Sequence, residues 1–154
     1  MTNEELLNLA LSLSPELKAR EKADRAAIIV PATMLVNILK TLRDDSRFQF
    51  DMLCSHTAID WLKDEKIELV YQIYSLANKN YFMVSTYIDR VTKTAPSVSS
   101  LWRIAEWQER EVYDLFGVLY ENHPDLRRLF LEDDWVGHPL LKDYKDDFLL
   151  ERPW

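Results

Sequence analysis

The residues best suited to chemistry lie in the last third of the chain, between positions 101 and 144. Two His-Pro pairs stand there, His123-Pro124 and His138-Pro139, with several aspartates nearby. Imidazole and carboxylate groups are ligands that zinc prefers, so one hypothesis is a metal-dependent enzyme that uses His123 and His138. The alternative is stronger, because a proline after each histidine favours turns and neither histidine has the i, i+4 partner of a helical zinc motif. We therefore predict no metal site and expect each imidazole to bond a main-chain carbonyl.

No other pattern indicates a catalytic residue. The chain has no Gly-x-Ser-x-Gly elbow, and neither of its two glycines stands in a phosphate-binding loop. Glu109 and Glu111 are conceivable as an acid and a base, but neighbouring helix residues point in different directions. Cys54 is the only cysteine, which excludes an internal disulfide and an iron–sulfur cluster held by this chain. We also expect Cys54 to lie in the core, and we predict that any redox cofactor belongs to a partner.

Composition points to one globular domain. The chain has 154 residues, of which 47% are hydrophobic and 29% charged, so it can bury a core without disulfides or metals. Its net charge of -7 repels nucleic acid and anionic lipid. The acidic first residues are unlike a signal or transit peptide, and no apolar run is long enough to span a membrane. We therefore expect a cytoplasmic location.

The N-terminal third is predicted to form two helices and a strand. Thr2 and Glu5 have the spacing of a capping box, followed by the apolar stripe of a helix. Ser14 and Pro15 resemble a second helix start, so we expect the helix to restart there and to end near residue 22. A β-branched run at 26–30 predicts a strand, and the apolar spacing after Pro31 predicts another helix.

Three alternating segments then predict half-buried strands. A hairpin turn is expected at residues 78–80, between the second and third segments. The apolar faces consist of Phe48, Phe50, Met52 and Cys54 in the first segment, Ile67, Leu69, Tyr71 and Ile73 in the second, and Phe82, Val84, Thr86 and Ile88 in the third.

A further helix is predicted after Pro96, with the serines at 97, 99 and 100 as candidate caps. Gly117 should end this helix in the left-handed conformation. Glu106, Arg110 and Asp114 are spaced four apart, so we expect them on its exposed side, with Arg110 paired to either carboxylate. Beyond position 120 only residues 124–131 have a helical pattern.

The rest of the C-terminal part is rich in arginine, tryptophan and tyrosine, the residues enriched at the energetic centres of protein interfaces. We therefore favour an interaction surface over the alternative that this part only covers the chain's own sheet. Gly117, Pro124, Gly137 and Pro139 are expected to be structural. The predicted partner-interface residues are Glu109, Arg110, Glu111, Asp114, His123, Asp125, Arg127, Arg128, Asp134, Trp135, His138, Lys142, Asp143 and Tyr144.

Three consecutive motifs, EREVYDLFGV, HPDLRR and DDWVGHPLLKDY, resemble the family of the 30-kilodalton subunit of proton-translocating NADH:quinone oxidoreductase, respiratory complex I. The sequence departs from the family's pattern at Asn122, Leu141 and Lys145. The resemblance implies an α+β fold: a two-layer domain with a mixed β-sheet covered by helices (residues 1–120), plus an extended C-terminal segment (121–154) that binds neighbouring subunits.

The resemblance also implies a non-catalytic peripheral-arm assembly subunit of a membrane-bound enzyme, on the cytoplasmic side of the inner (plasma) membrane. Iron–sulfur clusters, flavin and quinone are then expected in partner subunits, with the large quinone-site subunit and iron–sulfur subunits of the peripheral arm as neighbours and no cofactor in this chain. The same family includes subunits of energy-converting [NiFe] hydrogenases and ferredoxin-linked complexes, which form the alternative, because the motifs leave the electron donor open.

Overall fold

The computed structural model describes residues 2–21 and 23–147. A five-stranded sheet has the order β1-β2-β5-β4-β3, and its β2–β5 pair is parallel while the other pairs are antiparallel. A second sheet joins β6 to β7 in parallel. The strands are β1 (Lys18–Ala19), β2 (Ala27–Ile29), β3 (Met52–Trp61), β4 (Lys66–Ser75), β5 (Asn80–Asp89), β6 (Thr94–Pro96) and β7 (Leu119–Glu121).

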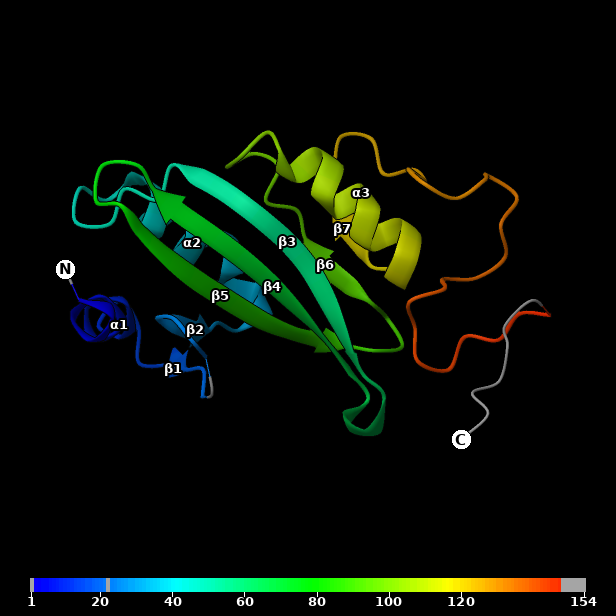
Figure 1. The fold of residues 1–154 in the computed structure, drawn as a ribbon, viewed down its shortest axis with the longest axis horizontal. Coiled ribbons are helices and arrows are strands. Elements are labelled where there is room, and N and C mark those ends of the chain that lie inside the picture. The colour runs from blue at the N-terminus through cyan, green and yellow to red at the C-terminus, as the bar shows by residue number, and fades with distance from the viewer. Residues whose placement is uncertain (1, 22, 148–154) are drawn as a thin grey trace.

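Helices cover the larger sheet and confirm the predicted two-layer α+β fold. Figure 1 shows α2 behind the strands, α3 beside β3, and α1 next to β1 and β2. Within the described residues no helix is long and apolar enough to cross a membrane. The helices are α1 (Asn3–Leu11), α2 (Leu35–Asp44) and α3 (Ala105–Phe116), with short 3₁₀ turns η1 (Ala32–Met34) and η2 (Leu62–Asp64).

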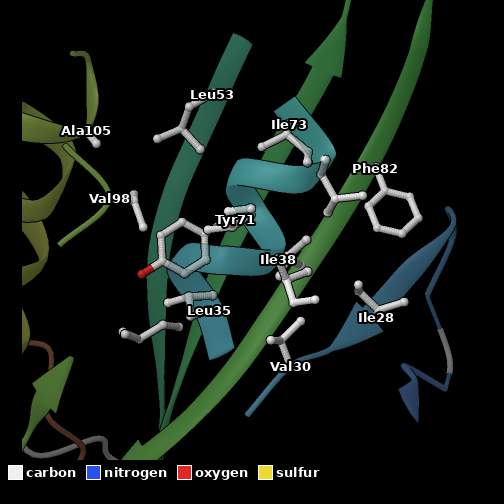
Figure 2. Packing of buried hydrophobic residues seen from close by; sticks show 14 of the residues in the cluster. Ile28, Val30, Leu35, Ile38, Leu53, Tyr71, Ile73, Phe82, Val98 and Ala105 are labelled. Atoms are coloured by element: carbon white, nitrogen blue, oxygen red, sulfur yellow. The ribbon is translucent and has the colours of Figure 1, made fainter. Parts of the chain in front are cut away.

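The core lies between α2 and the sheet. Leu35 and Ile38 of α2 face Tyr71 and Ile73 of β4, as Figure 2 shows. Phe82 of β5 extends the same apolar layer. Each such side chain contributes roughly 1.5–3 kcal/mol when it is fully buried. β3 forms one edge of this sheet, and α3 packs against it.

The alternating patterns of β4 and β5 predicted their buried faces correctly, and all eight residues named for these two strands are buried. Four residues, Leu76 to Lys79, form the turn that joins them, and Lys79 has a positive φ of 54°. The predicted hairpin is therefore confirmed.

The beginning of β3 differs from the prediction. Phe48 and Phe50 are buried as expected but precede the strand, and Met52 and Cys54 are exposed. Gln49 has a positive φ, and the pairing with β4 shifts register just after Leu53. Each irregularity changes which side chains face the core, so Leu53 takes the buried position and the predicted core position of Cys54 is wrong.

The second helix start predicted at Ser14 is also wrong. The capping box of Thr2 and Glu5 forms as predicted, but α1 ends at Leu11, and the chain then turns and pairs as β1 with β2. Arg20, just after β1, donates from Nε to Oε1 of the buried Glu68 at 2.8 Å. The pairing of β1 with β2 and the Arg20–Glu68 ion pair stabilise an extended chain here, and they outweigh the helical preference of the residues after Ser14. The predicted helix end at residue 22 lies outside the described residues.

Helix α3 begins later than its serines predict. Ile104 occupies the cap position and makes no side-chain cap bond. Ser97 instead donates from Oγ to Glu109 Oε2 at 2.6 Å. The prediction of a serine cap is therefore wrong, whereas Gly117 ends the helix with φ of 79° as expected.

Residues 122–147, which we call the tail segment, contain no helix or strand. Figure 1 shows this segment (orange to red) extending beyond α3, away from α1 and α2. The helix predicted at residues 124–131 is absent because the amides of Leu129, Phe130 and Leu131 donate to the Asp114 carboxylate. Amides bonded in this way cannot continue a helical ladder.

Candidate functional site

The tail segment is held to the last helix by Asp114. Oδ2 of this fully buried carboxylate accepts hydrogen bonds from the amides of Leu129, Phe130 and Leu131 at 2.7–3.1 Å, and Oδ1 accepts one from Arg128 Nη1 at 2.7 Å. Burial acts to raise the pKa of Asp114, but the three amides and the guanidinium outweigh it and lower the pKa to about 2. Asp114 is therefore an anion at neutral pH.

Arg128 extends this attachment along the tail segment. Its Nη2 donates to the main-chain oxygens of Trp135 and Gly137 at 2.8 and 3.1 Å. Its Nη1 also bonds the main-chain oxygen of Asp114. One guanidinium thus fixes two separate parts of the tail segment to the C-terminal end of α3.

The two glycines of the chain allow aromatic rings of the tail segment to pack directly against the backbone near the end of α3. Gly117 has a φ of 79°, and a Cβ there would lie 2.6 Å from Cδ2 of His138. Nδ1 of His138 bonds the main-chain oxygen of Asp114 at 3.0 Å. Gly137 has a φ of 85°, and a Cβ there would lie 2.9 Å from the ring of Tyr144. Gly117 therefore has the left-handed conformation predicted for the helix end, and a side chain at either glycine would collide with a ring of the tail segment.

A second ion cluster attaches the far end of the tail segment to the sheet. Arg90 forms paired hydrogen bonds with Asp60 of β3 at 2.7 and 3.0 Å and with Asp143 at 2.5 and 3.1 Å. The Lys142 amide also donates to Asp60, at 2.8 Å. The Arg90 guanidinium holds the pKa of Asp60 below its usual range. Sequence reasoning missed Asp60 and Arg90, although Asp60 occupies an inward position of β3, where a carboxylate needs a partner.

Arg110 was predicted to be exposed and paired with Glu106 or Asp114, and this is wrong. Its Nε donates to the main-chain oxygen of Arg127 at 3.1 Å, and its Nη2 to that of Arg128 at 3.0 Å. The guanidinium carbon lies 5.0 Å from the centroid of the Trp107 ring. Only 8% of Arg110 is exposed, because the tail segment packs over this face of α3.

Glu109 is also buried, and it organises the start of α3. Its carboxylate accepts hydrogen bonds from Ser97 Oγ at 2.6 Å and from the Val98 amide at 2.7 Å. Burial raises the pKa of Glu109 to about 7, against the lowering effect of these two hydrogen bonds. Glu111 is exposed on a different side of the helix, so the two glutamates do not face a common site.

The two histidines bond main-chain carbonyls, as their turn positions predicted. His123 Nε2 bonds the main-chain oxygen of Glu106 at 3.0 Å, and its Nδ1 accepts from the Asp125 amide. This pattern places the proton on Nε2 and leaves neither nitrogen available as a ligand. His138 lies elsewhere, against Gly117. Within the described residues no group of three His, Cys, Asp or Glu side chains is arranged to hold a metal ion.

The predicted interface residues therefore divide into two groups. One group makes intramolecular polar contacts: Arg110, Asp114, His123, Arg128, His138 and the partly exposed Asp143 hold the tail segment, and Glu109 holds the start of α3. The other group is exposed at the surface and comprises Glu111, Asp125, Arg127, Asp134, Trp135 and Lys142. Tyr144 is half-buried, and its hydroxyl lies 3.1 Å from Asp146 Oδ2 and 3.4 Å from the main-chain oxygen of Val136.

Large apolar side chains are exposed on the same segment. Phe130 is 66% exposed, Val136 84% and Leu140 50%. Trp107 of α3, whose ring lies against the Arg110 guanidinium, is 54% exposed. Where exposed apolar side chains form a contiguous patch, they mark protein–protein contact surfaces.

Comparison with known proteins identifies the family to which this sequence is similar. The family described as respiratory-chain NADH dehydrogenase, 30 Kd subunit, matches residues 28–147. An NADH-quinone oxidoreductase subunit of Moorella thermoacetica is 41% identical over 133 residues, covering 86% of this chain and 88% of the relative. The subunit of the same name in Geotalea uraniireducens is 40% identical over 129 residues, covering 83% and 77%.

Two solved structures share the fold. A chain of the membrane-bound sulfane sulfur reductase, an archaeal respiratory membrane complex, matches with a TM-score of 0.72 at 29% identity, covering 85% of this chain and 77% of that one. A trypsin-resistant fragment of Nqo5 matches with a TM-score of 0.69 at 26% identity, covering 82% and 100%. From its motifs, its fold and these matches, the chain belongs to the family of the 30-kilodalton subunit of respiratory-chain NADH dehydrogenase.

Proposed function

We propose that this chain is a peripheral-arm subunit of a membrane-bound, complex I-like NADH:quinone oxidoreductase, in which it binds neighbouring subunits and supports electron transfer without carrying a redox centre. Family membership supports the assignment to such a complex. The neighbours we propose are the quinone-site subunit and iron–sulfur subunits, with the chain on the cytoplasmic side of the membrane.

The observation that carries the binding role is the construction of the tail segment. Phe130, Val136 and Leu140 are exposed, while Asp114 and Arg128 fix the backbone that presents them. A preformed backbone lowers the entropic cost of association. The exposed apolar side chains, rather than the buried Asp114–Arg128 pair, are therefore the groups of the tail segment that we expect to contact a partner.

A related complex with another electron donor is the second candidate. The archaeal sulfane sulfur reductase chain resembles this chain at least as closely as the Nqo5 fragment does, with TM-scores of 0.72 and 0.69. The donor is a property of the partner subunits in either case.

The test is purification of the intact complex from the native membrane through a tag on this chain. We expect iron–sulfur and quinone-site subunits in equal amounts with the tagged chain, together with NADH:quinone reductase activity. Hydrogenase or ferredoxin-linked activity in the same preparation would favour the second candidate. A chain that purifies without redox subunits would contradict both.

A matched pair of variants tests the role of the tail segment. Leu140→Asp changes a side chain that is 50% exposed on this segment, and Leu76→Asp changes one that is 57% exposed on the turn between β4 and β5. We expect only Leu140→Asp to release the chain from the complex, because a charge would be desolvated at the contact. Equal retention of the two variants would remove the tail segment from the interface.

A further inference from the structure

Arg110 is a buried cation without a counter-ion in the part of the chain that the structure describes. Only 8% of the residue is exposed, yet its hydrogen bonds go to two neutral main-chain oxygens, those of Arg127 and Arg128. None of the ion pairs formed by the described residues includes it. Burying a charge is unfavourable unless an opposite charge compensates it. The group that would compensate Arg110 is therefore an anion.

The remaining donor nitrogen of Arg110 is available for that partner. Nε and Nη2 are held by the two carbonyls, and one face of the guanidinium lies over the Trp107 ring. Nη1 makes no hydrogen bond with the described residues. It is not one of the solvent-inaccessible side-chain atoms that lack a hydrogen-bond partner, so it is accessible to solvent. The guanidinium is thus fixed in orientation with one donor edge open.

Arg110 lines a small cavity of about 160 Å³, which we call the Arg110 pocket. This volume is sufficient for a carboxylate group. The lining residues are Glu106, Trp107, Arg110, His123, Asp125 and Arg127.

The charges around the Arg110 pocket select the class of ligand. Both ring nitrogens of His123 are engaged by main-chain groups, because Nδ1 accepts from the Asp125 amide and Nε2 bonds the Glu106 carbonyl, so His123 offers no donor to a ligand in the pocket. Arg127 pairs with Asp125 at 2.9 Å in an exposed ion pair. A phosphate would bring two negative charges against Glu106 and Asp125, whereas a carboxylate brings one and matches the flat guanidinium edge.

We propose that the Arg110 pocket receives the side-chain carboxylate of an aspartate or glutamate from a neighbouring subunit, with the Trp107 indole packing against the stem of that side chain. This inference rests on the proposed function and adds to it the chemistry of one anchoring contact. Arg128, by contrast, is fully engaged with this chain's own Asp114 and has no part in that contact.

Photo-crosslinking in the purified complex locates the ligand. p-Benzoylphenylalanine in place of Trp107 should crosslink to a peptide of another subunit that contains an aspartate or glutamate. The same amino acid in place of Leu76, which is 57% exposed on the β4–β5 turn, should not reach that peptide. A crosslink confined to this chain, residues 148–154 included, or to a peptide without an acidic residue overturns the proposal.

Substitution of the acid identified on the partner tests its energetic role while leaving this chain unchanged. Replacing it with its amide should reduce retention of this subunit through a salt wash by on the order of tenfold, since truncating one member of a desolvated charge pair has at least that effect. Combining this change with Arg110→Gln should add little, as expected for two groups that act as one contact. Unchanged retention refutes the inference, and the proposed function stands if the wild-type subunit co-purifies.

Discussion

Asp114 and Arg128 form a buried ion pair, with 2.7 Å between Oδ1 and Nη1, although fourteen residues separate them in the chain. The pair joins α3 to a segment that has no regular secondary structure. Arg128 therefore stabilises the fold of this subunit, a role that its sequence motif did not predict.

Arg128→Ala should destabilise the isolated chain by about 3–5 kcal/mol, because it leaves the Asp114 carboxylate buried without its cation. Arg127→Ala removes only an exposed pair with Asp125 and should change the free energy of unfolding by less than about 1 kcal/mol. Urea unfolding of the two variants measures the difference. Equal midpoints would show that the buried pair does not hold the tail segment.

Asp114 should contribute to acid unfolding. Its pKa is lowered from 3.8 to about 2, so its stabilising effect is present above pH 3.8 and is lost as pH falls toward 2. The stability difference between wild type and Asp114→Asn should therefore shrink by roughly 2 kcal/mol over that window. Denaturant titrations at pH 5, 4, 3 and 2 measure this change, and a constant difference would contradict the assignment.

Glu109 should have the opposite dependence on pH. Its pKa is raised from 4.5 to about 7, so the folded state is favoured below pH 4.5 and loses stability as pH rises through 7. Glu109→Gln remains neutral and should lack this loss, which amounts to roughly 3 kcal/mol in the wild type. The comparison requires melting curves of both proteins from pH 4.5 to 8. Parallel pH profiles would show that Glu109 ionises with an ordinary pKa.

Gly117→Ala should loosen the tail segment. The position combines a φ of 79° with a Cβ that would lie 2.6 Å from the His138 ring, and an alanine at positive φ is itself strained. We expect a loss of at least about 1 kcal/mol and faster proteolysis within residues 122–147. Ala105→Gly, in the first turn of the same helix, controls for a general loss of helix stability, since it should not speed cleavage of the tail segment selectively.

The sequence predicted well those strands that pair with their neighbours without a bulge or a register shift, because their side chains alternate regularly between the two faces of the sheet. β4 and β5 pair without a register shift, and the faces predicted to be buried are buried. The pattern failed at Cys54, because a positive φ at Gln49 and a register shift after Leu53 change the phase of alternation. Such irregularities leave no periodic signal in the residues themselves.

Charged residues were predicted less well, because spacing on a helix does not show which face another segment will cover. Glu106, Arg110 and Asp114 have the spacing of a solvated row, yet Arg110 and Asp114 are buried under the tail segment. The amides of residues 129–131 bond Asp114 and so cannot form the helix that their sequence favours locally.

By itself, the sequence determined the order of the main strands and helices, the conformational need for Gly117 and Gly137, and the family motifs, because each of these depends on residue type and local spacing. The tertiary structure alone decided which charges are buried and with whom they pair. Asp60, Arg90 and Asp143 lie up to 83 positions apart in the chain and meet only after β3, β5 and the tail segment have packed together. The free energy of a charge depends on its surroundings in space, and those surroundings come from segments distant in sequence.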